Sequence, residues 1–195
     1  MESSELLTLL QNTGAMLEGH FLLTSGRHSN VYIEKFRILE DPNALDKACR
    51  AMAEIVMDEN VELVLGAAIG GILIAGGVGR HLNVRHIFSE RVNGKMELRR
   101  GFSITKGQRV VIVEDIITTG GSVVELIQLA KEQGAEVVHV VNLVHRSAKE
   151  IDFRVPSTAL LTIPSESWQP IDCPLCKQGV PVTERGRTGK KMETA

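Results

Sequence analysis

Short, uninterrupted apolar runs alternate with segments of helical periodicity in the middle of the chain, between residues 63 and 144. Continuous Val/Ile runs joined by helices are typical of a parallel sheet that is covered on both faces. The pattern therefore predicts an α/β fold with a mainly parallel sheet flanked by helices. The predicted strands are 63–65, 84–88, 110–113 and 137–144; one predicted helix follows the turn 66–71 and runs to His81, and another runs from Ser122 to Gln133.

Two further helices are predicted ahead of this unit. Residues 4–13 carry four leucines in an amphipathic pattern, and Gly14 can supply the left-handed residue that ends a helix. Asp41 offers an N-cap and Pro42 a first-turn proline for a second helix, which we expect to end near Asn60.

The segment 89–105 does not follow this alternation of apolar runs and helical segments. Its Asn93-Gly94 pair is a strong signal for a two-residue hairpin turn, so we expect an arm that protrudes from the sheet. Beyond Pro164 the pattern becomes irregular, and 183–195 is polar enough to predict a flexible tail. Residues 1–182 are then expected to form a single domain.

Composition narrows the classes of protein that need considering. The 195 residues suffice for one sizeable core, and the net charge of -2 gives no basic surface for nonspecific binding to nucleic acid. Residues 63–79 are uncharged but too short and glycine-rich for a membrane span. Three cysteines and no recognisable secretory leader favour the cytoplasm. We therefore expect neither a nucleic-acid partner nor a membrane partner.

The segment 110–122 combines features that suit a sugar phosphate. A buried strand ends in Glu114 and Asp115, and hydroxyl residues and Gly120-Gly121 then open a helix. Glycines let the backbone approach a phosphate, and the helix N-terminus favours its negative charge. The carboxylates can accept hydrogen bonds from ribose hydroxyls and stabilise a cationic sugar ring. Alternatively, they are ordinary capping groups at a strand end.

The order of these residues differs from a P-loop and from a dinucleotide-binding fingerprint, but it resembles the signature of type I phosphoribosyltransferases. That family binds phosphoribosyl pyrophosphate (PRPP). The resemblance implies the type I phosphoribosyltransferase fold, with a small hood from the N-terminal and C-terminal segments. The PRPP-binding residues that it implies are Glu114, Asp115, Ile116, Ile117, Thr118, Thr119, Gly120, Gly121, Ser122, Ala68, Gly70, Gly71, Arg91 and Lys95.

The stretch 19–32, with Ser25-Gly26-Arg27-His28-Ser29, resembles the motif of the orotate-specific branch of this family. The residues that the resemblance implies for orotate binding are Thr118, Arg146, Ser25 and Gly26. A guanidinium suits the orotate carboxylate because it can form paired hydrogen bonds.

The resemblance also implies a reaction. Ribose 5-phosphate would pass from PRPP to orotate, giving orotidine 5'-monophosphate and pyrophosphate in pyrimidine biosynthesis, with Mg²⁺ as cofactor. The arm would cover the neighbouring site of a homodimer, and Lys95, Arg91 and Asp115 would be catalytic. The arm departs from many relatives, however: it has Arg91-Val92 in place of an Arg-Lys pair and lacks a histidine.

Two other functions stay open. A purine phosphoribosyltransferase would share the PRPP loop but would need no arginine for a base carboxylate. A PRPP-sensing regulator that binds RNA or DNA would use the same fold without turnover.

Direct metal ligands are not expected. Mg²⁺ would be held mainly by PRPP. Cys173 and Cys176 have the spacing of half a zinc site, but the sequence offers no second pair, and the six histidines lack metal-ligand spacing. Cys49 lies in a helical pattern and is assigned to the core.

Overall fold

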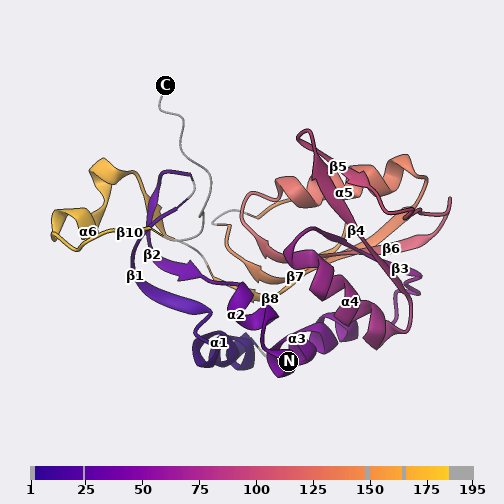
Figure 1. Cartoon of the computed structure of the whole chain (residues 1–195), viewed down its shortest axis with the longest axis horizontal. Helices are drawn as coiled ribbons and strands as arrows, with labels where there is room; N and C mark the ends of the chain where they lie inside the picture. Colours follow the sequence, from indigo (N-terminus) through magenta and orange to yellow (C-terminus); the bar gives the residue numbers. More distant parts are fainter. Residues whose placement is uncertain (1–2, 24, 148–149, 164–165, 185–195) are drawn as a thin grey trace.

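A six-stranded sheet forms the centre of the computed structural model, which describes residues 3–23, 25–147, 150–163 and 166–184 (Figure 1). All neighbouring strands pair in parallel except β5, which is antiparallel to β4 at one edge. The predicted mainly parallel sheet is therefore confirmed. In spatial order the strands are β5 (Lys95–Leu98), β4 (Arg85–Val92), β3 (Leu63–Ala67), β6 (Arg109–Ile117), β7 (Glu136–His145) and β8 (Ser157–Thr162).

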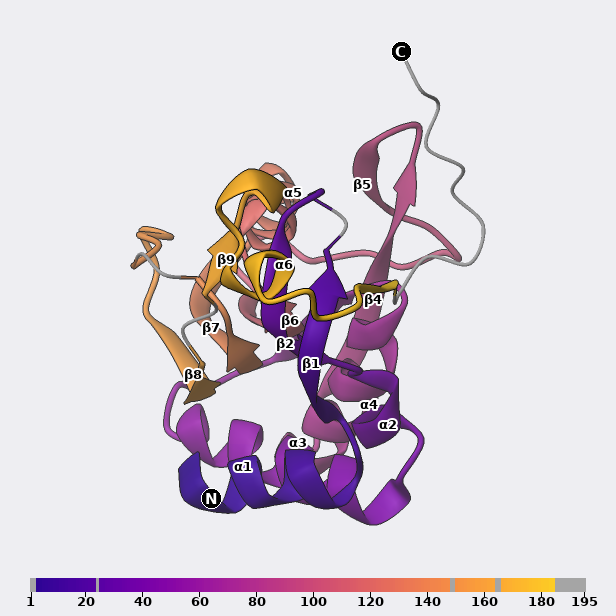
Figure 2. The same cartoon turned by 90° about the vertical axis from the view of Figure 1, so that its left-hand side faces the viewer.

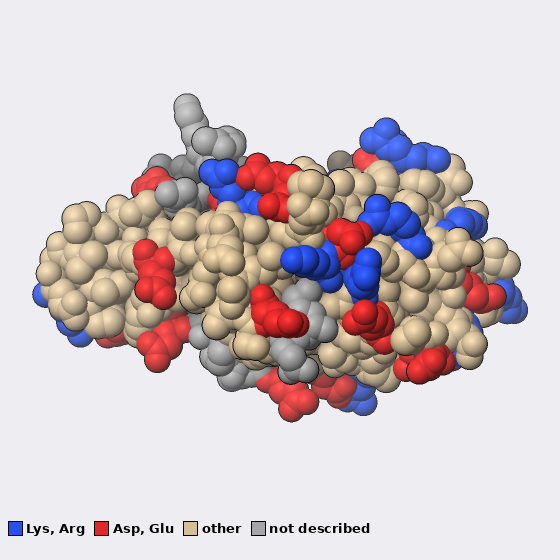
Figure 3. Space-filling model, turned by 90° about the horizontal axis from the view of Figure 1, so that it is seen from below, with Lys and Arg blue, Asp and Glu red and all other residues tan. Residues whose placement is uncertain are grey.

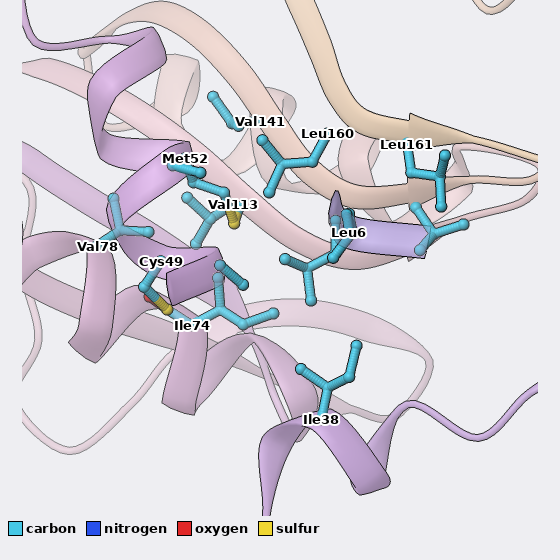
Figure 4. Close-up of a cluster of buried hydrophobic side chains, with 14 of the residues drawn as sticks. Leu6, Ile38, Cys49, Met52, Ile74, Val78, Val113, Val141, Leu160 and Leu161 are labelled. Atoms are coloured by element: carbon cyan, nitrogen blue, oxygen red, sulfur yellow. The ribbon is translucent and has the colours of Figure 1, made fainter. Parts of the chain in front are cut away.

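Helices cover both faces of this sheet, as the uninterrupted apolar strands require. On one face lie α1 (Ser3–Asn12), α3 (Pro42–Ile55) and α4 (Gly70–Leu82), and α5 (Gly121–Glu132) lies on the other (Figure 1). The side chains of β6 point alternately to the two faces of the sheet and contribute to the hydrophobic core on each face. Val111 and Val113 pack with the first set of helices, and Figure 4 shows Val113 in this core, whereas Val110 and Ile112 pack with α5.

A second, four-stranded sheet forms the predicted hood (Figure 2). Its centre is the antiparallel pair β1 (Met16–Leu22) and β2 (His28–Ile33). The edges come from the other end of the chain: β9 (Ser167–Trp168) pairs with β2, and β10 (Thr183–Glu184) pairs with β1. Between β9 and β10 lie the 3₁₀ turn η1 (Pro170–Asp172) and the short helix α6 (Pro174–Lys177).

The first two residues of the predicted tail form a strand. Thr183 and Glu184 form β10, because their backbone pairs with the edge of β1. The remaining residues of that tail, 185–195, lie outside the described part of the chain.

The start of α3 was predicted correctly, but its end was not. Asp41 caps α3 by accepting from the backbone N–H groups of Asn43 and Ala44, at 2.9 and 2.8 Å. The helix ends at Ile55 instead of near Asn60, and a turn precedes β3. The expected hairpin is present, with Asn93 and Gly94 both at positive φ between β4 and β5. A short helix that was not predicted, α2 (Phe36–Leu39), links the hood to α3.

Charged side chains of both signs are interspersed on the face shown in Figure 3. Among the described residues, no helix is long and apolar enough to cross a membrane.

Candidate active site

The loop between β6 and α5 forms a small, mostly polar cavity. Strand β6 ends at Ile117 and α5 begins at Gly121, so Thr118, Thr119 and Gly120 alone make the connection. The first hydrogen bond of the helix runs from the Val124 N–H to the Gly120 carbonyl at 3.0 Å, which leaves the amides of the first turn without helical partners. The cavity holds about 50 Å³, room for roughly four oxygen-sized groups. A phosphate group matches both its size and its donors.

Gly120 is required at the N-cap for two reasons. Its φ is 77°, in the left-handed region that other residues rarely adopt. A Cβ at this position would also lie 2.9 Å from the Phe153 ring, closer than side chains pack. The glycine therefore lets the loop pass between this ring and the cavity.

The two carboxylates at the end of β6 are buried. Glu114 accepts a hydrogen bond from the Asp115 N–H at 3.0 Å, and Asp115 accepts one from the Ile116 N–H at 2.6 Å. Burial, reinforced by the Asp115 charge, raises the pKa of the Glu114 carboxyl to about 8. The proton that Glu114 carries at neutral pH limits the negative charge of the pair.

Lys35, which the sequence analysis missed, supplies the countercharge. Its Nζ lies 2.7 Å from Asp115 Oδ2, and it precedes α2. No local sequence signal could have identified it, because 80 positions separate the partners and the packing of α2 against α3 and α4 brings them together.

The glycine-rich turn after β3 lies against the same carboxylate. A Cβ on Gly70 would overlap Asp115 Oδ2, and a Cβ on Gly66 would overlap the Gly71 carbonyl. The peptide bond between Ala68 and Ile69 is cis, and the Ala68 N–H donates to the Ser89 carbonyl at 2.9 Å. The turn that carries Ala68, Gly70 and Gly71, which the resemblance implies for PRPP binding, and the acidic pair therefore form one contiguous site.

Known proteins share this sequence and arrangement. The model of the phosphoribosyl transferase domain matches residues 36–177. The chain is 47% identical to an orotate phosphoribosyltransferase of Desulforamulus reducens, over 95% of this chain and 97% of that relative. It is 45% identical to an orotate phosphoribosyltransferase of Thermotoga maritima, over 94% of this chain and 98% of that relative. The chain belongs to the orotate phosphoribosyltransferase family.

The fold agrees with this assignment. The crystal structure of orotate phosphoribosyltransferase from Aeropyrum pernix aligns with a TM-score of 0.70 at 29% identity, covering 89% of this chain and 98% of that one. The type I phosphoribosyltransferase fold expected from the resemblance is thus confirmed.

In this member of the orotate phosphoribosyltransferase family, Arg146 connects the sheet to the hood. It follows β7 and is buried. Its backbone N–H donates to the Ile117 carbonyl at 2.8 Å, and its Nη2 donates to the Val31 carbonyl of β2 at 3.0 Å. Arg146 therefore links the end of β6, which directly precedes the loop 118–120, to the hood.

The turn between β1 and β2 carries Ser25 and Gly26, both exposed. Gly26 has a φ of 76°, and its N–H donates to the Leu23 carbonyl at 2.9 Å. Arg27 fastens the turn to the C-terminal segment by donating from Nε to the Ser167 hydroxyl at 2.9 Å.

The basic residues of the arm do not join the acidic pair. Arg91 binds both carboxylate oxygens of Glu125 on α5, each at 2.9 Å, and Arg100 binds Glu90 at 2.8 Å. Lys95 is exposed at the start of β5, next to the hairpin turn. Arg91 thus lies beside α5 just beyond the phosphate-sized cavity, and Lys95 faces solvent.

Proposed function

We propose that this chain transfers ribose 5-phosphate from PRPP to orotate, releasing pyrophosphate and forming orotidine 5'-monophosphate. The observation that carries the proposal is the phosphate-sized cavity at the start of α5, directly beside a buried acidic pair. The family membership supports orotate as the base acceptor.

The test is turnover. Purified protein mixed with PRPP, Mg²⁺ and orotate should deplete the orotate absorbance, and omission of any one component should stop the reaction. Turnover with adenine, guanine or hypoxanthine but not with orotate would contradict the substrate assignment and favour a purine enzyme.

Within this proposal the protein positions the reactants and stabilises charge. The loop 118–122 binds the 5'-phosphate, the turn 68–71 binds the pyrophosphate, and Glu114 and Asp115 accept hydrogen bonds from the ribose hydroxyls. Positioning and preorganised charge are the main contributions available, because orotate is the nucleophile and pyrophosphate is a good leaving group.

Mg²⁺ would neutralise the pyrophosphate as it leaves. The residues present fit a cation held by PRPP oxygens better than one bound directly by the protein, because the Lys35 ammonium already occupies the position next to Asp115 Oδ2. The task of Asp115 is then to hold the sugar, with Lys35 fixing the orientation of its carboxylate.

Arg146 is proposed to bind the orotate carboxylate. Arg146→Ala should weaken orotate binding by ~1 to 3 kcal/mol, the range for a lost charged hydrogen bond, while PRPP binding changes little. The matched variant Arg146→Lys keeps the charge but not the paired geometry, so we expect it to recover only part of the affinity. Equal losses for orotate and PRPP would indicate collapse of the hood instead of a lost base contact.

We also propose a homodimer in which the arm of one subunit covers the site of the other. Exposed apolar side chains at Phe36 on α2 and at Ile69 and Leu73 at the start of α4 support an association surface near the site.

Subunit complementation tests the arm. Lys95→Ala and Asp115→Asn should each lower activity. If the arm acts in trans, mixing the two variants should restore part of the activity through one intact site per heterodimer. Mixed samples that are no more active than the separate variants would contradict a shared site.

A regulator that binds RNA or DNA is less well supported, because the net charge is -2 and charges of both signs alternate on the face in Figure 3. A gel shift that depends on PRPP, without turnover of orotate, would favour it. We keep the cytoplasm as the predicted compartment.

A further inference from the structure

Two histidines and two cysteines from opposite ends of the chain meet in the hood. His20 lies on β1, His28 on β2, Cys173 just before α6 and Cys176 within it. One ligand atom from each residue lies within 4.8 Å of all the others. The sequence offers no second cysteine pair, but the structure places two histidines beside the two cysteines. The partners are histidines that only the pairing of β1 with β2 places together.

The separations between these atoms approach those of a tetrahedral centre. The His20 Nε2 and His28 Nδ1 atoms are 2.8 Å apart, Cys173 Sγ is 3.4 Å from His20 Nε2, and Cys176 Sγ is 3.3 Å from His28 Nδ1. Zinc bonds of about 2.0 to 2.1 Å to nitrogen and about 2.3 Å to sulfur place tetrahedral ligands ~3.3 to ~3.8 Å from one another. The two imidazoles would separate by about half an ångström around such an ion.

The second nitrogen of His20 already has a suitable partner. Its Nδ1 lies 2.7 Å from the Val180 carbonyl oxygen. A carbonyl can only accept, so Nδ1 donates and the Nε2 lone pair points toward His28 and the cysteines. A metal-bound histidine characteristically donates its other N–H to a carbonyl or carboxylate in this way.

Backbone pairing of β9 and β10 attaches this segment to the hood, but few of its side chains are buried. Across the described residues 166–184, Cys173 is the only buried residue, and Ile171 is 82% exposed. The apolar burial that normally fixes a segment is therefore almost absent, as in small domains that depend on a metal or disulfides. Metal binding can supply that stabilisation directly.

We propose that His20, His28, Cys173 and Cys176 bind one structural Zn²⁺ ion that joins the C-terminal segment to the β1–β2 pair. A closed set of two thiolates and two imidazoles suits zinc and leaves no open position for catalysis. The ion holds β9, α6 and β10 against the hairpin whose turn carries Ser25 and Gly26. This proposal does not depend on which base the enzyme uses.

Metal content tests the proposal. The full chain, expressed with zinc and freed of any histidine tag, should retain one zinc per chain after dialysis against a weak chelator, measured by mass spectrometry of the metal. Cys173→Ser and Cys176→Ser should lose the ion. Cys49→Ala is the matched control, because Cys49 is a buried thiol in α3, remote from the hood, and this variant should retain it.

Cobalt provides a second measurement that needs no variant. Co²⁺ added to the metal-free, reduced chain should give thiolate charge-transfer bands and the intense visible bands of tetrahedral coordination, and Zn²⁺ should abolish them. A folded chain with reduced thiols that holds no zinc and gives no such bands would overturn the proposal. Zinc retained in full by both serine variants would overturn it as well.

Discussion

The buried Glu114 should make folding stability depend on pH in a way that one substitution removes. The pKa of Glu114 is about 8 in the folded chain against 4.5 for an unperturbed carboxyl, because burial and the Asp115 charge both oppose ionisation. Between these values the unfolded chain has lost the proton and the folded chain has kept it. The contribution of Glu114 to the free energy of unfolding must therefore fall as pH rises from 4.5 toward 8.

The size of this effect follows from the two pKa values. Their difference converts to at most ~5 kcal/mol, and entry of water around the ionised carboxylate reduces it, so we expect a fall of at least ~1 kcal/mol. Glu114→Gln is the matched control. Its amide oxygen can still accept the Asp115 N–H, but it carries no titrating proton.

Urea unfolding at a series of pH values between 4.5 and 8 measures the effect. Circular dichroism is the suitable probe, since the sole tryptophan, Trp168, lies in the hood and not in the main sheet. Burial lowers the pKa of His139, which makes stability rise with pH in both proteins and therefore cancels in the comparison. Parallel curves for the wild type and Glu114→Gln would refute the reasoning.

Two glycines give further predictions, each with a nearby glycine as control. Gly70→Ala should push the Asp115 carboxylate away from its position and lower kcat/KM for PRPP by ~10-fold or more, about 1.4 kcal/mol, in steady-state assays. Gly76→Ala in the same helix should have little effect, because its added Cβ would meet only the His86 side chain, at 3.7 Å. Equal losses of kcat/KM in the two variants would contradict the explanation. Gly120→Ala should destabilise the fold by ~1 to 3 kcal/mol in urea unfolding, because the φ of this residue is +77° and its added Cβ would lie too close to the Phe153 ring. Gly121→Ala should not destabilise the fold, because its added Cβ would meet only one atom within 4 Å, at 3.8 Å. An equally large loss of stability in Gly121→Ala would argue against a special role for Gly120.

Features encoded by neighbouring residues were predictable from the sequence. Asp41 and Pro42 fixed the start of α3 because a cap and a first-turn proline act over three residues. Asn93-Gly94 fixed the hairpin because both residues tolerate positive φ. The mainly parallel sheet followed from the family resemblance and from apolar runs long enough to be buried on both faces.

Features made by contacts between distant parts of the chain were not predictable. No local sequence pattern indicates that Lys35 forms an ion pair with Asp115. His20 and His28 are separated by eight positions, which matches no metal-binding pattern, and they meet the cysteines only after the two ends of the chain form one sheet. The end of α3 was misplaced because Val56, which follows the last helical residue Ile55, continues the apolar pattern of the helix.

The strand order of the hood also determines when this part of the enzyme can form. β1 and β2 emerge first from the ribosome, but both strands that flank them, β9 and β10, come from residues 167–184. Until those residues are synthesised, the hairpin presents two unpaired edges, and such edges invite pairing with other chains. The hood is thus completed only after the strands of the main sheet, the last of which ends at Thr162, have been synthesised.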